Sequence, residues 1–177
     1  MMTITRSVLQ VEQPVHHFLE LPEEIRNIAD FVLDTYHRRR GWQRENFEEK
    51  FKDVLVSTAH QSQFVVVKND DGKLLGTQRL IGIPAGGQLA PAEDTFGVRA
   101  ISPEFSKIEI GMFVLDHTIS NEERKNVRNE LWKPFFAEAR KYDFCVAYTD
   151  APTTRLFQTW GMKIVSSCHL NNIRWGA

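Results

Sequence analysis

Two charged residues in predicted strands offer acid–base and carboxylate-binding chemistry. Glu109 lies in the strand predicted for residues 108–116, and Arg79 lies in the strand predicted for residues 74–83. A carboxylate on a central strand can accept a proton, directly or through water, and a neighbouring guanidinium would keep it ionised. The alternatives are that the two form a buried structural ion pair, which is compatible with catalysis, or that Arg79 binds a ligand carboxylate through its planar fork.

Two basic clusters are candidates for binding an acidic partner. Residues 38–40 are three arginines near the end of the first predicted helix, and Arg124, Lys125 and Arg128 stand at the start of a later one. Each cluster can equally be a solvated helix face. The six histidines show no metal-ligand spacing, and no Ser-His-Asp arrangement, P-loop or dinucleotide fingerprint is present. We therefore expect no metal.

The first half of the chain predicts two helices and a hairpin. Apolar residues recur at helical spacing from Pro22 to a stop at Gly41, and again over residues 46–54. Two apolar strands, residues 63–68 and 74–83, flank an Asn-Asp-Asp-Gly turn and predict an antiparallel hairpin. Residues 1–20 are an arm or edge strand.

The second half predicts a parallel crossover. The strand over residues 108–116 is followed by a helix that starts at Ser120, where Glu123 has capping-box spacing, and then by a strand over residues 144–149. Pro134 should kink the helix. The remaining expectations are a binding loop over residues 84–103, a short helix over 152–159 and closing strands over 163–175. The sheet must be mixed.

Composition excludes several classes of function. The 177 residues suit one domain spanning 1–177, with 42% hydrophobic and 25% charged residues. The net charge of -1 gives no global field for nucleic acid. The apolar stretches are too short for a transmembrane segment, and no secretory signal pattern begins the chain, so we expect a cytoplasmic protein. Cys145 and Cys168 are expected to be reduced thiols.

Four short patterns, in chain order, resemble the autoinducer (acyl-homoserine lactone) synthase branch of the GNAT acyltransferase superfamily. Their order is more specific than any one of them. They are Thr35-Tyr36-His37-Arg38-Arg39-Arg40-Gly41-Trp42, Leu75-Gly76-Thr77-Gln78-Arg79-Leu80, Glu109-Ile110-Gly111-Met112-Phe113-Val114-Leu115-Asp116, and Thr149 to Met162 with Arg155-Leu156-Phe157 and Trp160-Gly161-Met162. The resemblance implies a GNAT-like α/β fold: a mixed, mostly antiparallel sheet with a parallel strand-helix-strand crossover and helices on both faces.

Departures from the family pattern concern the substrates. The autoinducer synthases carry arginines where this chain has Val32 and Met112, and paired aspartates whose spacing is not matched here. Those groups are associated with S-adenosylmethionine, so the related N-acyl amino acid synthases are the closer analogy. The turn over residues 116–121 lacks the glycines that let a GNAT backbone approach the coenzyme A pyrophosphate, and Phe157 replaces a frequent tyrosine acid. Both features favour a carrier-protein thioester without excluding acyl-CoA.

The resemblance implies an N-acyltransferase with no tightly bound cofactor. Its co-substrate is acyl-CoA or an acyl carrier protein (acyl-ACP) thioester, and its acceptor is a small amine such as an amino acid. Glu109 and Arg79 are the expected catalytic residues. The expected donor-binding residues are Phe113, Val114 and Leu115 (through backbone N–H), Arg124, Lys125, Arg128, Tyr148 and Thr149, and the expected acceptor-binding residues are Trp42, Arg79 and Arg155.

Two other functions stay open at this stage. One is a conventional acetyl-CoA-dependent GNAT N-acetyltransferase with an altered coenzyme turn. The other is a catalytically silent GNAT-like binding module, since a fold does not fix a function.

Overall fold

A computed structural model describes residues 3–40, 47–87, 101–147, 155, 157–159 and 161, with no side-chain description for residues 38–40. The described strands form one sheet in the order β1-β2-β3-β4-β5. The pairs β1–β2, β2–β3 and β3–β4 are antiparallel, and β4–β5 is parallel. The strands are β1 (Ile4–Gln10), β2 (Ser62–Asn69), β3 (Leu74–Ile83), β4 (Lys107–Leu115) and β5 (Phe144–Ala147).

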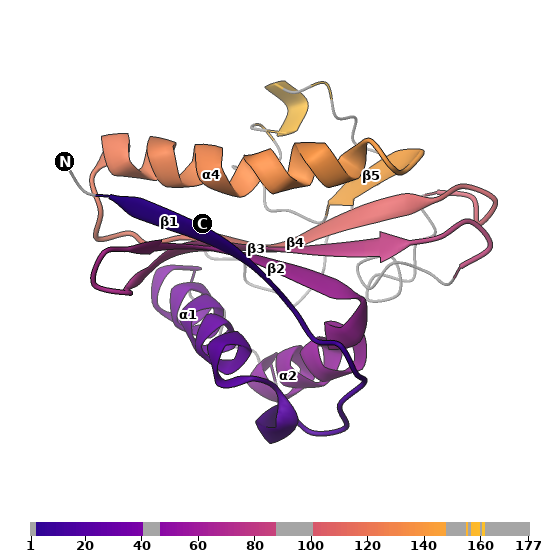
Figure 1. The fold of residues 1–177 in the computed structure, drawn as a ribbon, viewed down its shortest axis with the longest axis horizontal. Helices are drawn as coiled ribbons and strands as arrows, with labels where there is room; N and C mark the ends of the chain where they lie inside the picture. Colours follow the sequence, from indigo (N-terminus) through magenta and orange to yellow (C-terminus); the bar gives the residue numbers. More distant parts are fainter. Residues whose placement is uncertain are drawn as a thin grey trace.

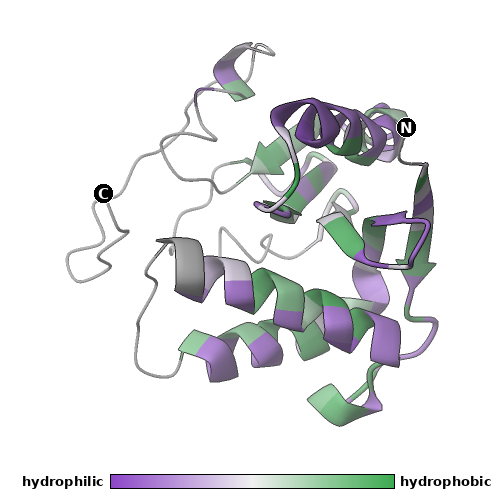
Figure 2. Ribbon diagram, turned by 90° about the vertical axis from the view of Figure 1, so that its left-hand side faces the viewer, coloured by the Kyte–Doolittle hydropathy of each residue, from purple (hydrophilic) through white to green (hydrophobic). Residues whose placement is uncertain are grey.

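Helices cover both faces of this sheet (Figure 1). The pair α1 (Glu23–Arg40) and α2 (Phe47–Thr58) lies against one face, and α4 (Asn121–Ala139) lies along the other. Short 3-10 turns, η1 (Phe18–Glu20) and η2 (Ala59–Gln61), precede α1 and β2. The helices below the sheet in Figure 2 alternate hydrophobic and hydrophilic residues, as helices with one buried face must.

Each face of the sheet has its own apolar core. Phe64 and Val66 of β2 point to the α1/α2 side, and Val65 and Val67 point to the α4 side. This alternation makes β2 a strand that is buried on both faces. On the α1/α2 side the core also contains Ile25, Ile28, Ala29, Val32 and Leu55, and on the α4 side Val127, Leu131, Trp132 and Phe135.

The hairpin predicted from the Asn-Asp-Asp-Gly turn is confirmed. The Asn69 side-chain oxygen accepts from the backbone N–H of Asp71 at 3.1 Å and of Lys73 at 2.8 Å. Gly72 has a φ of 78°, a left-handed conformation that glycine adopts without steric cost. Side-chain and backbone preferences therefore specify the same turn.

The mixed sheet with a parallel crossover is also confirmed. Strand β4 continues through α4 into β5, which lies parallel beside it. The Ser120 hydroxyl accepts from the Glu123 N–H, and the Glu123 carboxylate accepts from the Ser120 N–H, so the capping box is present. Pro134 lies inside α4 without ending it. The second helix is longer than predicted, reaching Thr58.

None of the helices in the described part of the chain combines the length and the hydrophobicity that a membrane crossing requires.

Candidate functional site

Strand β4 carries one extra residue relative to β3 in the middle of the sheet. Thr77 pairs with Val114 and Arg79 pairs with Gly111, so β4 spans one residue more than β3 between these pairs. Met112 lies inside this bulge with a φ of 51°, the left-handed region. Such a conformation costs roughly 1–3 kcal/mol and persists only where the surroundings hold it. Bulges of this kind bend a strand and are frequent beside active sites.

The bulge changes which neighbours β4 contacts. Ile108 and Ile110, which precede the bulge, pack in the core under α4. Met112 inside the bulge and Val114 at its end pack in the core of α1 and α2. The parallel pairing with the described part of β5 extends only to Ile110 and Ala147. The bulge therefore coincides with the end of the described pairing, and β4 continues past it to Leu115.

The predicted donor-binding segment of β4 presents side chains to the two cores. The Phe113 ring lies 5.0 Å from the Trp132 ring of α4, and Leu115 packs in the same layer. Val114 is buried in the other core. Phe113 and Leu115 are only partly buried. The donor-binding role itself stays a prediction.

Arg79 and Glu109 lie on neighbouring strands and on the same face of the sheet. Arg79 is opposite Gly111, and Glu109 is two residues before that glycine. A methyl group built on Gly111 would stand 3.7 Å from Arg79 Nε and 3.9 Å from Glu109 Oε1, so both charged groups flank this glycine. The side chains are 6% and 4% exposed. The structure thus brings together the two residues that the sequence analysis selected for catalysis.

Contacts with α2 hold the Arg79 guanidinium in place. Arg79 Nη1 donates to Thr58 Oγ1 at 3.1 Å, and the Thr58 hydroxyl donates to the Val54 carbonyl at 2.6 Å. Burial lowers the pKa of Arg79, and the nearby Glu109 carboxylate and Tyr36 oppose that shift. Arg79 Nε has no hydrogen-bond partner in the described structure. One donor of the guanidinium is therefore bonded, and another is buried with no partner among the described residues.

The basic cluster at the start of α4 is only partly free. Arg124 donates through Nη2 to the His117 carbonyl, which ties it to the turn between β4 and α4. Arg128 is half-buried and Lys125 is exposed. Lys125 and Arg128 are thus the members of the cluster that are best placed to contact a partner.

In the turn before α4, side-chain carboxylates accept hydrogen bonds from backbone N–H groups. Asp116 is 4% exposed, and its Oδ1 accepts from the Thr118 N–H at 2.8 Å and the Thr118 hydroxyl at 2.9 Å. Its Oδ2 lies 2.7 Å from Lys73 Nζ. Burial opposes ionisation of Asp116, but the bonds from Lys73 and Thr118 outweigh it and lower the pKa. The carboxylates of Asp116 and Glu123 therefore accept from the backbone N–H groups of Thr118 and Ser120, which could otherwise bind phosphate.

The other predicted site residues are placed less fully. Trp42, Tyr148 and Thr149 lie outside the described residues. Arg155 is exposed on a short helical stretch, and the neighbouring Phe157 ring is buried 5.7 Å from the Trp132 ring. Phe157 therefore belongs to the core under α4 rather than to an acid–base site.

Sequence reasoning missed three residues of this region. Thr58 was placed beyond the second helix, although it anchors Arg79. The strained conformation of Met112 has no signal in the residue type. Lys107 is 2% exposed at the start of β4, and the alternation of charged and apolar residues over 107–110 was the signal that could have revealed it.

The described residues contain no group of three or more histidine, cysteine, aspartate or glutamate side chains that could hold a metal ion. Cys145 is a free thiol whose pKa burial raises to about 12, so it is not a reactive thiolate at neutral pH.

Solved structures identify the fold, although no protein-family model and no curated protein sequence matches this chain. The N-acyl amino acid synthase FeeM from uncultured soil microbes aligns with a TM-score of 0.66 and 14% identity, over 98% of this chain and 86% of its own. An acyl-CoA N-acyltransferase from Pseudomonas aeruginosa aligns at 0.58 and 11%, over 95% and 94%. A predicted acetyltransferase with acetyl-CoA from Clostridium acetobutylicum aligns at 0.59 and 8%, over 97% and 96%.

The chain has the GNAT fold, and its described elements follow the predicted order. At these identities the likeness establishes architecture alone.

Proposed function

We propose that the protein is an N-acyltransferase that moves an acyl group from a phosphopantetheine thioester to a small amine such as an amino acid. The observation that carries this proposal is the position of the buried Arg79–Glu109 pair beside the β4 bulge. An ionisable carboxylate, a fixed guanidinium and an irregular strand backbone then meet within one part of a GNAT fold. The similar solved structures described as acyl- and acetyltransferases support the same class.

The reaction assigns a separate task to each group. Glu109 takes a proton from the neutral acceptor amine as its nitrogen attacks the thioester carbonyl. Backbone N–H groups of β4 near Phe113 stabilise the developing oxyanion. The C–N bond forms, the C–S bond breaks, and the proton passes to the leaving thiolate. Arg79 keeps Glu109 ionised before the transfer.

An acyl carrier protein is the donor that the α4 turn favours over free acyl-CoA. Coenzyme A brings a pyrophosphate, which needs free amides and positive charge at a helix start. Here Asp116 and Glu123 occupy amides of that turn and would repel a pyrophosphate. A carrier protein instead brings a single phosphodiester and an acidic surface, for which exposed Lys125 and half-buried Arg128 are suited.

An acceptor with a carboxylate fits the open side of the guanidinium. Arg79 Nε has no described partner, although the residue is almost fully buried. A substrate carboxylate would supply the missing acceptor in a charge-assisted bond. Arg155 and Trp42 remain proposed as further acceptor contacts. That FeeM is described as an N-acyl amino acid synthase supports an amino acid.

The test is to find the product and to compare donors. Mass spectrometry of small molecules in cells that overproduce the protein should reveal acylated amines, which should disappear with the Glu109→Ala variant. With the purified protein, acyl-ACP should then give a higher kcat/KM than the acyl-CoA of the same chain length.

Two results would change the proposal. Faster turnover with acetyl-CoA than with any acyl-ACP would make the protein a conventional N-acetyltransferase. No product in cells and no turnover with either donor would contradict an enzymatic function and favour a binding module.

A further inference from the structure

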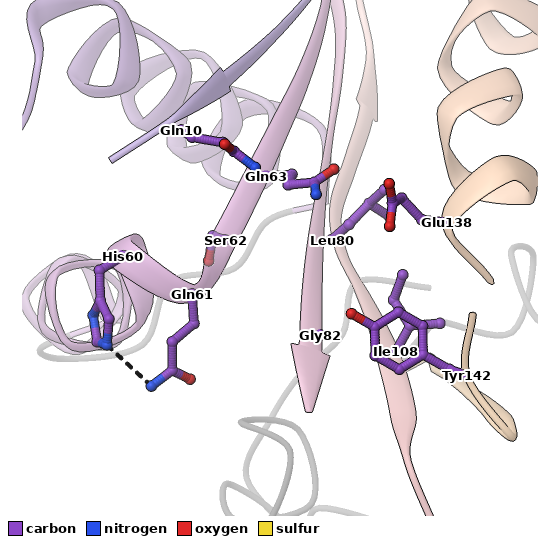
Figure 3. Close-up of a pocket in the computed structure, with 10 residues that line it drawn as sticks. All are labelled: Gln10, His60, Gln61, Ser62, Gln63, Leu80, Gly82, Ile108, Glu138 and Tyr142. Atoms are coloured by element: carbon purple, nitrogen blue, oxygen red, sulfur yellow. Dashed lines mark hydrogen bonds between the residues drawn. The ribbon is translucent and has the colours of Figure 1, made fainter. Parts of the chain in front are cut away.

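A cavity lies on the face of the sheet opposite to Arg79 and Glu109. It has a volume of about 150 Å³ and opens between the end of α4 and strands β1 to β4 (Figure 3). Its floor includes Leu80 and Ile108, which belong to the core under α4. The volume is that of about five water molecules, and thus of a small organic molecule.

The walls of this cavity are polar where the rest of the face is apolar. Gln10 and Gln63 are directly opposite each other on β1 and β2, so their side chains are neighbours. Figure 3 shows both extending toward Glu138 from the end of α4. Of the side chains drawn, only those of His60 and Gln61 hydrogen-bond to each other. Several carboxamide and carboxylate groups therefore converge without bonding to one another.

A glycine shapes the remaining wall. Tyr142 follows α4 and lies over Gly82 so closely that a methyl group on that glycine would stand 2.0 Å from the Tyr142 hydroxyl oxygen. No other residue type at this position would leave the hydroxyl where it is. The tyrosine therefore presents a hydroxyl at the edge of the cavity, beside Glu138.

Among the residues that line the cavity, Glu138 is the acidic one and His60 the basic one. Glu138 lies in the last turn of α4, where the helix carbonyls already give a negative potential and where α4 has no basic residue. The described lining residues include no lysine and no arginine. Lys141 contacts one oxygen of Glu138 at 2.8 Å from outside the lining, which leaves the other oxygen available. Carboxamide oxygens, a hydroxyl and a carboxylate all accept from an ammonium group.

We propose that this cavity binds a small organic cation that carries a primary ammonium group. Glu138 supplies the charge, and the Gln63 and Gln10 oxygens and the Tyr142 hydroxyl accept the remaining N–H bonds. The site is separate from the proposed acyl-transfer site, because the sheet lies between them. It does not depend on the protein being an acyltransferase.

The test is a titration of the isotope-labelled protein with ethanolamine, followed by NMR. The backbone amide signals of Gln10, Gln63 and Gly82 should shift and saturate. Ethylene glycol, which lacks the charge, and glycolate, which reverses it, are the matched probes and should not saturate the same signals. Glu138→Gln keeps the shape of the side chain and should weaken ethanolamine binding about tenfold, the usual worth of one charge-assisted bond at a partly exposed site.

Two further variants test the hydroxyl group of this site and a charge on α4 that lies outside it. Tyr142→Phe removes only the hydroxyl and should weaken binding by a smaller factor. Glu130→Gln, on the same helix but outside the cavity, should leave the affinity unchanged. Equal binding of glycolate, an unchanged affinity in Glu138→Gln, or the absence of saturable shifts with ethanolamine would each overturn the proposal.

Discussion

The Arg79–Glu109 region and the turn before α4 both combine acidic and basic groups, but they do so in opposite environments. Arg79 and Glu109 lie in the layer between the sheet and α1/α2, each less than a tenth exposed. In the α4 turn, the buried Asp116 is ringed by Thr118 and Lys73, while Lys125 stays exposed. One region shields its charges from water, whereas the other presents some of them to it.

This difference suits the buried pair to chemistry and the partly exposed turn to the recognition of a partner. Charges that are removed from water interact strongly, and they destabilise the fold when one partner is lost. Exposed charges are screened over roughly 10 Å or less at ordinary ionic strength and contribute to encounter and specificity. We therefore propose proton transfer at the buried pair and partner binding at the α4 turn.

The largest predicted effect on stability comes from removing the buried guanidinium. Arg79→Met keeps much of the volume but leaves Glu109 buried without its positive neighbour, and it should lower the free energy of unfolding by about 3 kcal/mol. Urea unfolding at neutral pH measures this loss. The control is Arg6→Met, which breaks an exposed pair with Glu130 at 2.9 Å and should cost no more than about 1 kcal/mol. Equal losses would show that burial of the pair does not matter.

Substitutions at two glycines of the same sheet should affect different properties, one the stability of the fold and the other turnover. A methyl group on Gly76 would stand 2.7 Å from Val127 Cγ1 in the core under α4, so Gly76→Ala should destabilise the fold by roughly 1–3 kcal/mol. Gly111→Ala meets nothing nearer than 3.7 Å and should leave stability nearly unchanged. It nevertheless places a methyl group between Arg79 and Glu109 and should lower turnover. Thermal unfolding and activity assays of both variants test this contrast.

The buried acid of the α4 turn predicts a pH dependence. Because the pKa of Asp116 is lower in the folded protein than in the unfolded chain, its ionised form stabilises the fold above the unfolded pKa of about 3.9. That contribution disappears as the pH falls through the folded pKa. Asp116→Asn should cost about 1 kcal/mol at neutral pH. The difference between variant and parent should shrink below pH 4 in acid titrations of stability, and a constant difference would contradict this assignment.

The next effect concerns donor binding by the basic cluster at the start of α4. Changing Arg124, Lys125 and Arg128 to glutamate should raise the KM for acyl-ACP about tenfold at low salt, with a smaller change at high salt because exposed charges are screened. Reversal of Lys133, further along the same helix, and of Lys141, just beyond its end, is the matched control and should change the KM little. A salt-independent effect, or an equal effect of the control, would move the donor entrance away from this turn.

Local patterns made the secondary structure predictable from the sequence. The hairpin turn, the α4 capping box and the parallel crossover depend on residues close together in the chain, such as Asn69, Gly72 and Ser120. Each of these features is determined by a short stretch of the chain. That the strands of Glu109 and Arg79 are neighbours was instead implied by the resemblance to the GNAT family.

The details that define the site depend on packing between distant segments. The bulge at Met112 depends on register with β3, and the anchoring of Arg79 depends on where α2 ends. Neither is visible in the residue types. The carboxylates that occupy the α4 turn were visible as residues, but their bonds to Thr118 and Ser120 needed coordinates. The sequence therefore predicted the members of the site better than their geometry.

The central claim is that Glu109 acts as the base of an acyl transfer, and Glu109→Gln tests it most directly. The substitution keeps the shape of the side chain and removes the proton acceptor. With the amine that accumulates in acylated form in cells and a matching acyl-ACP, kcat should fall roughly 10²–10⁴-fold, the usual worth of a positioned general base. Urea unfolding should show that the variant still folds. Full turnover in a folded Glu109→Gln protein would contradict the account and leave this residue with a structural role alone.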